Sequence, residues 1–153
     1  MPNRNVHRPA GTVCGAGYAY YRARNFPLEH ALAEAMGGAA GGWLGGALPD
    51  WIDPATSPNH RHVGHGAANV VGAVWFSADA LLNLQQHLRQ RANALQSNRR
   101  LLNDDLQRFL SAVAEFLLRF LAGLLNGISA GYISHLLLDA LTARGIPVFA
   151  RGY

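Results

Sequence analysis

The stretch from Leu28 to Ala47 decides the fold and reads LEHALAEAMGGAAGGWLGGA. It carries glycines at 37, 41 and 45 and a second set at 38, 42 and 46, so two stripes of small residues follow the helical repeat. Each glycine weakens a helix by about 1 kcal/mol relative to alanine. We therefore expect a helix whose glycines allow neighbouring backbones to approach closely, as in membrane helix pairs and some tight soluble contacts. The alternative is a flexible glycine-rich loop.

The composition favours helices over strands. Half of the 153 residues are hydrophobic, leucine and alanine dominate, and β-branched runs are few. We predict one all-α domain over residues 1–153, a compact bundle of four to five helices with no repeat or linker dividing it. The expected helices are Thr12–Arg24, Leu28–Ala47, Gly64–Arg91, Asn103–Leu125 and Gly127–Ala143.

Residues 85–108, QQHLRQRANALQSNRRLLNDDLQR, form the most polar part of the chain. We expect them to make the tip of a helical hairpin, with its turn near Ser97 and Asn98. The five arginines in this segment could contact nucleic acid or lipid headgroups. No aromatic residue is interleaved to stack on bases, which makes nucleic acid the weaker partner.

The sequence leaves the relation to a membrane open. The start, MPNRNVHRPAGTVCGAG, lacks the apolar core of a cleavable signal peptide, so we do not expect secretion. The uncharged runs 35–49 and 120–134 are 15 residues each, short of the roughly 20 that span a bilayer. If the second run is extended back to Phe109, the longer segment contains only two charged residues, Glu115 and Arg119. These two are four apart and could pair on a helix. The sequence is therefore compatible with a membrane-spanning, a peripheral and a soluble protein.

The lone cysteine, Cys14, excludes a disulfide within the chain. We expect Cys14 to be a core residue with no chemical role.

Residues 48–66, LPDWIDPATSPNHRHVGHG, concentrate metal-ligand side chains in a chain that is poor in charge. Carboxylates and imidazoles are ligands that zinc, manganese and iron share. Asp50 and Asp53 could bind one ion together or two neighbouring ions, and the alternative is helix capping. Among the three histidines His65 is the best placed, while His60 and His62 have no assigned role.

A second cluster lies in residues 131–147, GYISHLLLDALTARGIP. His135 and Asp139 are four apart in an expected helix, so both side chains project from one face. An unpaired carboxylate on this apolar helix would be costly to bury. Asp139 therefore needs a partner, either an arginine or a metal. We predict a metal site between the end of the glycine-rich helix, the loop that follows it and the last helix.

These motifs, in this order and with the early His7-Arg8 pair, resemble the YdjM-like family of bacterial membrane-associated, metal-dependent hydrolase-like proteins. The resemblance covers most of the chain. It implies association with the bacterial inner membrane or a cytoplasmic location, and it places Arg61 in the site. In this chain Gly64-His65-Gly66 replaces the family's usual Thr-His-Ser, which removes two hydroxyl groups. The metal ligands that it implies are His7, Asp50, Asp53, His65, His135 and Asp139.

We expect a phosphoester hydrolase whose substrate is phospholipid or nucleotide-like. One or two divalent ions, zinc first and manganese or iron as alternatives, would activate the water that attacks. Arg61 offers a planar fork for the anion, and Asp50 or Asp53 could accept a proton.

Two other functions fit the same residues. The ligands could hold a structural metal in a non-catalytic membrane or assembly protein, where the ion would be fully enclosed by protein. The arginine-rich hairpin could instead dock nucleic acid or a protein partner, and the glycine-rich helix could pack within the chain or join two copies in a homo-oligomer.

Overall fold

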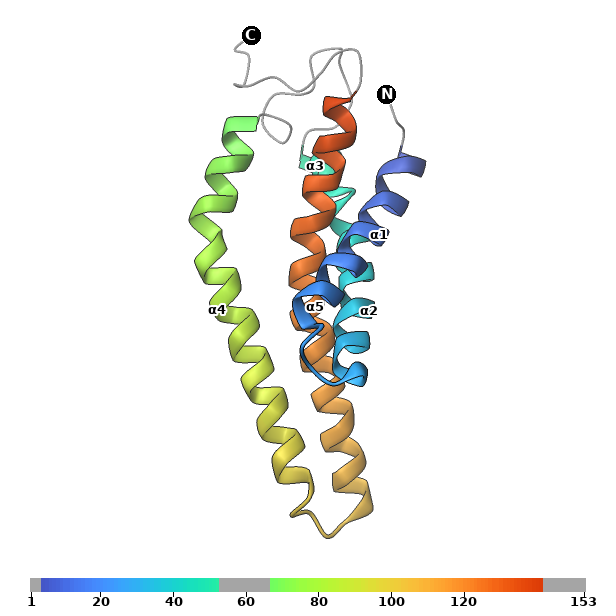
Figure 1. Ribbon diagram of the computed structural model, residues 1–153, viewed down its shortest axis with the longest axis vertical. Coiled ribbons are helices and arrows are strands. Elements are labelled where there is room, and N and C mark those ends of the chain that lie inside the picture. Colours follow the sequence, from blue (N-terminus) through green and yellow to red (C-terminus); the bar gives the residue numbers. More distant parts are fainter. Residues whose placement is uncertain (1–3, 53–66, 142–153) are drawn as a thin grey trace.

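A computed structural model of the chain describes residues 4–52 and 67–141, with side chains described for 6–52 and 79–141. This part is built from helices joined by short turns, as predicted for an all-α bundle (Figure 1). Four helices are long and one is short. They are α1 (Arg4–Ala23), α2 (Leu28–Gly45), α3 (Leu48–Ile52), α4 (Ala67–Arg99) and α5 (Asp105–Ala140).

The helices α1, α2 and α5 form a compact group, and α4 runs alongside α5 (Figure 1). In this group α2 is parallel to α5 and antiparallel to α1. The start of α1, the end of α2, the short α3 and the end of α5 consequently lie at one end of the molecule. At the other end the α4–α5 hairpin projects beyond the turn between α1 and α2.

The first glycine stripe of α2 packs directly on the backbone of α5. A Cβ atom at any glycine of this stripe would overlap a carbonyl oxygen of α5. The overlapping pairs are Gly37 with Phe120, Gly41 with Leu124 and Gly45 with Ile128. In return, Gly123, Gly127 and Gly131 of α5 lie against the backbone of α2 at Glu34, Gly38 and Gly42.

The second stripe of α2 packs on α1. Gly38 and Gly42 lie against the backbones of Gly15 and Gly11, and Gly46, just after the helix, lies against the carbonyl of His7. Both stripes are thus covered within one chain. The predicted helix with close backbone contacts is confirmed, and the loop alternative is wrong.

One predicted helix boundary in the first third of the chain is wrong, and another is correct to within two residues. Helix α1 begins at Arg4 instead of Thr12 and runs through Pro9, so His7 lies inside it. Proline costs the helix one hydrogen bond, and packing against α2 compensates. Helix α2 ends at Gly45, and Pro49 lies in the first turn of α3, where its missing N–H would have no helical acceptor in any case.

The boundaries of the long hairpin also differ from those predicted. Helix α4 continues through Ser97 and Asn98 to Arg99, and Asp104 caps α5 by accepting a hydrogen bond from the Leu106 amide at 3.0 Å. Helix α5 is continuous where a break at 126–127 was expected. Gly127 lies inside the helix, where the absence of a Cβ lets it pack directly against the backbone of Gly38.

Polar side chains fasten α4 to α2 and α5. Arg89 donates two hydrogen bonds, of 2.9 and 2.6 Å, to the carboxylate of Glu34, which is fully buried on α2. One turn away, Gln85 donates to the Asn126 side chain of α5 at 2.9 Å. One turn beyond Arg89, the apolar Ala92 of α4 is also fully buried.

A second polar group surrounds Glu115 of α5. The predicted pair with Arg119 is present at 3.0 Å, and Glu115 also bonds Arg99 at 2.9 Å and His30 at 3.0 Å. Arg119 is 1% exposed and donates to the Asn93 side chain at 2.9 Å. Two carboxylates and three arginines thus lie between α4 and its neighbours.

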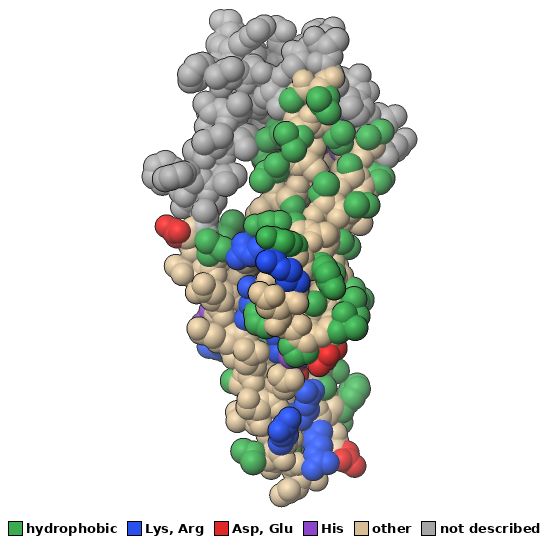
Figure 2. Space-filling view, viewed as in Figure 1, with side chains coloured by type: hydrophobic (Ala, Val, Ile, Leu, Met, Phe, Trp, Pro, Cys, Tyr) green, Lys and Arg blue, Asp and Glu red, His purple; other side chains and the backbone are tan. Residues whose placement is uncertain are grey.

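Within the described residues, α5 is the helix long and apolar enough to cross a membrane. Large hydrophobic side chains on α1, α2 and α5 are exposed, and Figure 2 shows such side chains over the upper part of the molecule, with arginines near its middle and at the hairpin tip. Cys14 is exposed, so the expectation that it is a core residue is wrong.

Replacing Gly41 by alanine tests the close packing of α2 on α5. We expect Gly41→Ala to lower the unfolding free energy by about 3 kcal/mol, the upper end of the usual cost of overpacking, because a carbonyl oxygen cannot yield as a side chain can. The matched control is Gly17→Ala on α1, where a Cβ meets nothing within 4 Å. The control should be neutral or stabilising by up to about 1 kcal/mol. Thermal unfolding in detergent measures both, and equal stability of the two variants would refute the packing.

Replacing Arg89 tests the polar attachment of α4. Arg89→Met leaves the buried Glu34 carboxylate unpaired, so we expect a loss of about 3–5 kcal/mol. Adding Glu34→Gln removes that buried charge and should restore at least half of the loss. The same unfolding assay applied to the single and double variants measures the coupling. Additive losses would show that the two side chains do not depend on each other.

Candidate metal centre

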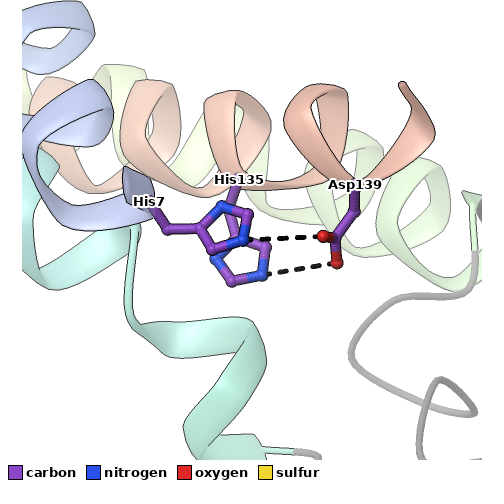
Figure 3. A group of neighbouring side chains, drawn as sticks. All are labelled: His7, His135 and Asp139. Carbon is purple, nitrogen blue, oxygen red and sulfur yellow. Dashed lines mark ion pairs between the residues drawn. The ribbon is translucent and has the colours of Figure 1, made fainter. Parts of the chain in front are cut away.

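Four metal-ligand side chains meet at the end of the bundle where α1 begins and α5 ends. His7 comes from α1, Asp50 from α3, and His135 and Asp139 from successive turns of α5. The contact between Gly46 and the carbonyl of His7 brings α1 close to the end of α2. His7, His135 and Asp139 are at most 3% exposed, and Figure 3 shows them grouped on one side of α5.

The Asp139 carboxylate faces both imidazoles, one oxygen to each (Figure 3). Its Oδ1 lies 3.5 Å from His7 Nε2, and its Oδ2 lies 3.6 Å from His135 Nε2. On the other side, Asp50 Oδ1 lies 3.7 Å from the same His135 nitrogen. The Asp50 side chain is 21% exposed, which makes it the most exposed of the four.

The backbone of α2 fixes the orientation of His135. Its Nδ1 lies 2.7 Å from the carbonyl oxygen of Gly46. A carbonyl only accepts hydrogen bonds, so Nδ1 carries the proton and donates. His135 Nε2 is then directed at the two carboxylates, the arrangement usual for a histidine that binds metal through one nitrogen and is oriented through the other.

The spacing of these groups fits a shared cation. Two ligand atoms about 2.1 Å from one ion at a tetrahedral angle lie roughly 3.4 Å apart, close to the 3.5–3.7 Å found here. A direct N–H···O hydrogen bond would instead measure about 2.7–3.2 Å. Ligand atoms of His7, His135 and Asp139 all lie within 4.8 Å of one another. With neutral imidazoles the two carboxylates give the group a charge that a divalent cation neutralises.

One feature of the geometry requires adjustment before an ion can bind. The rings of His7 and His135 stack with their centroids 3.8 Å apart and their planes 15° from parallel. Lone pairs in nearly parallel planes do not converge on one point. One of the two rings must therefore turn, and His7 is the candidate because Gly46 holds His135.

The structure thus brings together four of the six ligands that the sequence predicted: His7, Asp50, His135 and Asp139. The predicted ligands Asp53 and His65, and the anion-binding Arg61, lie outside the described residues, as do His60 and His62. The contribution of Gly46 was missed, because a backbone acceptor leaves no chemical signal in a sequence. Its only trace is its position at the end of the second glycine stripe.

Among the comparisons with known proteins, a protein family gives a match. No curated protein and no solved structure matches the chain. A family model described as YdjM inner membrane protein matches residues 1–150, nearly the whole chain. This match confirms the family that the ordered motifs predicted, and it agrees with the presence of a helix able to cross a membrane. The chain therefore belongs to the YdjM family of inner membrane proteins.

Proposed function

We propose that the chain is a metal-dependent hydrolase of the inner membrane that acts on a phosphoester. The observation that supports this most strongly is the grouping of His7, His135 and Asp139, whose ligand atoms all lie within 4.8 Å of one another, with Asp50 3.7 Å from His135. His7, Asp50, His135 and Asp139 would hold one divalent ion. A second ion would require the remaining predicted ligands, Asp53 and His65. Zinc suits this mixed set best, and manganese and iron also accept it.

Each described residue has a distinct part in this proposal. His135 is the fixed ligand, because the Gly46 carbonyl holds its ring. Asp139 sets the distance between the two imidazoles, since each of its oxygens faces one ring. Asp50 is the most exposed of the four and can accept a proton. A bound divalent ion would supply Lewis acidity and lower the pKa of water. Arg61 would bind the anionic group of the substrate.

The surroundings of Asp50 favour an amphiphilic substrate over a nucleotide. Trp51 and Ile52 follow Asp50 in α3 and are 48% and 55% exposed. Apolar side chains beside the most exposed group of a polar site suit a ligand that carries both an anionic group and a hydrocarbon chain. A phospholipid fits this description, and the inner membrane supplies it.

The second candidate function is a structural metal site in a non-catalytic membrane protein. The near-complete burial of His7, His135 and Asp139 favours it, because structural ions are enclosed by protein. The two functions share the ion but differ at Asp50. A structural ion needs this carboxylate only as a ligand, whereas a hydrolase also needs it beside the substrate.

Metal content per chain tests the shared premise. We expect about one equivalent of zinc, manganese or iron in the wild type and less than a tenth of it in Asp139→Ala, because both imidazoles lose the carboxylate between them. The matched control is Asp105→Ala, which removes a carboxylate that is 97% exposed at the hairpin tip. Plasma mass spectrometry on protein purified without chelators or a metal-binding tag measures all three. A folded, metal-free wild type under metal-replete conditions would rule out both functions.

Turnover separates the two functions. We expect the metal-loaded wild type in lipid nanodiscs to release the headgroup of a fluorescent phospholipid. Asp50→Asn should slow the release by roughly 10²–10⁴-fold, the usual contribution of a positioned base, while retaining at least half of the metal. The assay also includes a soluble phosphodiester. Stoichiometric metal with no hydrolysis of either substrate would favour the structural site.

A further inference from the structure

The projecting end of the α4–α5 hairpin has two flanks of opposite character. We define the hairpin arm as residues 86–99 of α4 with residues 105–117 of α5. Its inner part contacts the start of α2 through Arg89, Gln96 and Glu115, and its outer part extends past the α1–α2 turn (Figure 1). Because the two helices lie side by side and antiparallel, every level of the arm presents one α5 flank and one α4 flank. This surface lies far along the hairpin from the candidate metal ligands, which are at the other end of the bundle (Figure 1).

The α5 flank is a continuous apolar stripe. Its side chains recur at three- and four-residue intervals, so they share one face of the helix. All of them are 39–63% exposed although they are large and hydrophobic. Leu121, 44% exposed, continues the stripe toward the rest of the bundle, to a total length of about 22 Å at 1.5 Å per residue. The stripe consists of Leu106, Phe109, Leu110, Val113, Phe116 and Leu117.

The α4 flank is polar over the same levels. One of its exposed residues, Ala94, is small and apolar, and all the others are polar or charged. Arg91 on this flank donates a hydrogen bond to His87 at 3.0 Å, also at the surface. The exposed residues are Gln86, His87, Gln90, Arg91, Asn93, Ala94, Ser97 and Asn98.

The two flanks argue against an arm that crosses the bilayer and against an arm that lies wholly in water. Crossing the bilayer would place the α4 flank in hydrocarbon, where one arginine alone costs about 2.5–3.5 kcal/mol and each amide adds to that cost. An arm wholly in water would leave six large hydrophobic side chains exposed along one face. An amphipathic element with one apolar and one polar side instead lies along a membrane surface.

We propose that the hairpin arm lies in the plane of the membrane surface, with the α5 stripe in contact with lipid acyl chains and the α4 flank facing water. Lipid is the occupant because the chain belongs to a family of inner membrane proteins and because large hydrophobic side chains farther along α5, such as Ile133 and Leu137, are also exposed. The ion pair of Arg99 with Glu115 then holds the water-facing helix to the lipid-facing one, and Arg89 holds it to Glu34 of α2.

Spin labels on single cysteines test this placement. Cys14 is the one cysteine of the chain, so a Cys14→Ser background accepts one label at a time. Labels at Leu106, Val113 and Leu121 report the stripe, and labels at Gln90 and Ala94 report the matched opposite flank. The full chain is reconstituted in nanodiscs of phosphatidylethanolamine and phosphatidylglycerol, and collisions with oxygen and with a water-soluble nickel chelate are compared.

We expect the three stripe labels to collide with oxygen and not with nickel, at depths that agree within a few ångströms, and the two α4 labels to do the reverse. A depth that changes steadily by up to about 1.5 Å per residue from Leu106 to Leu121 would show that the arm crosses the bilayer and would overturn the proposal. Stripe labels accessible to nickel would place the arm in water. Stripe labels inaccessible to both reagents would mean that protein, such as a second copy, covers the stripe.

Retained thermal stability of each labelled variant confirms its fold. Leu110 on the stripe and Ser97 on the α4 flank replace positions that do not tolerate a label.

Discussion

Direct contact between the backbones of α1, α2 and α5 is the constraint on which the rest of the structure depends. Glycine disfavours a helix, yet α2 contains one at nearly every contact with its neighbours. The absence of a Cβ lets carbonyl oxygens of α1 and α5 approach the α2 axis. The same contacts position the candidate metal ligands, because Gly46 lies against the carbonyl of His7 and accepts the hydrogen bond of His135. The arrangement of the ligands thus depends on glycines that carry no chemistry of their own.

The fourth long helix is held by different forces. Between α4 and its neighbours the described side chains form ion pairs and amide hydrogen bonds, such as Arg89–Glu34 and Gln85–Asn126. Buried charge pairs add little net stability over apolar packing, but removing one partner is costly. Such pairs therefore determine where α4 lies more than they increase the free energy of unfolding. Over residues 86–99 the exposed side of α4 is almost entirely polar and has little means of contacting lipid, whereas its inner side includes the fully buried Ala92. In this part of the hairpin α4 therefore differs from the apolar stripe of α5.

The sequence predicted those features that depend on periodicity and on residue chemistry. The two glycine stripes, the pairing of Glu115 with Arg119, and the shared face of His135 and Asp139 follow from spacing along a helix. The approach of Asp50 to His135 was predicted from the kinds of ligand that the two segments carry. Features set by tertiary contacts were missed. Pro9 and Gly127 resemble helix breaks locally, but packing on α2 keeps both helices continuous. His7 was found only through the family motif, because an early histidine before an expected helix has no local reason to reach α5.

Metal K-edge X-ray absorption of the zinc-loaded chain tests the central claim most directly, since it counts the imidazoles around the ion. A zinc ion held by this cluster should have nitrogen and oxygen neighbours at about 2.0–2.2 Å, with the outer-shell scattering of at least two imidazoles. His7→Gln should lower the imidazole count by one, because His7 and His135 face the same Asp139 carboxylate. An imidazole count unchanged by His7→Gln, or a spectrum of water oxygens alone, would contradict a metal centre built where the glycine-packed helices end.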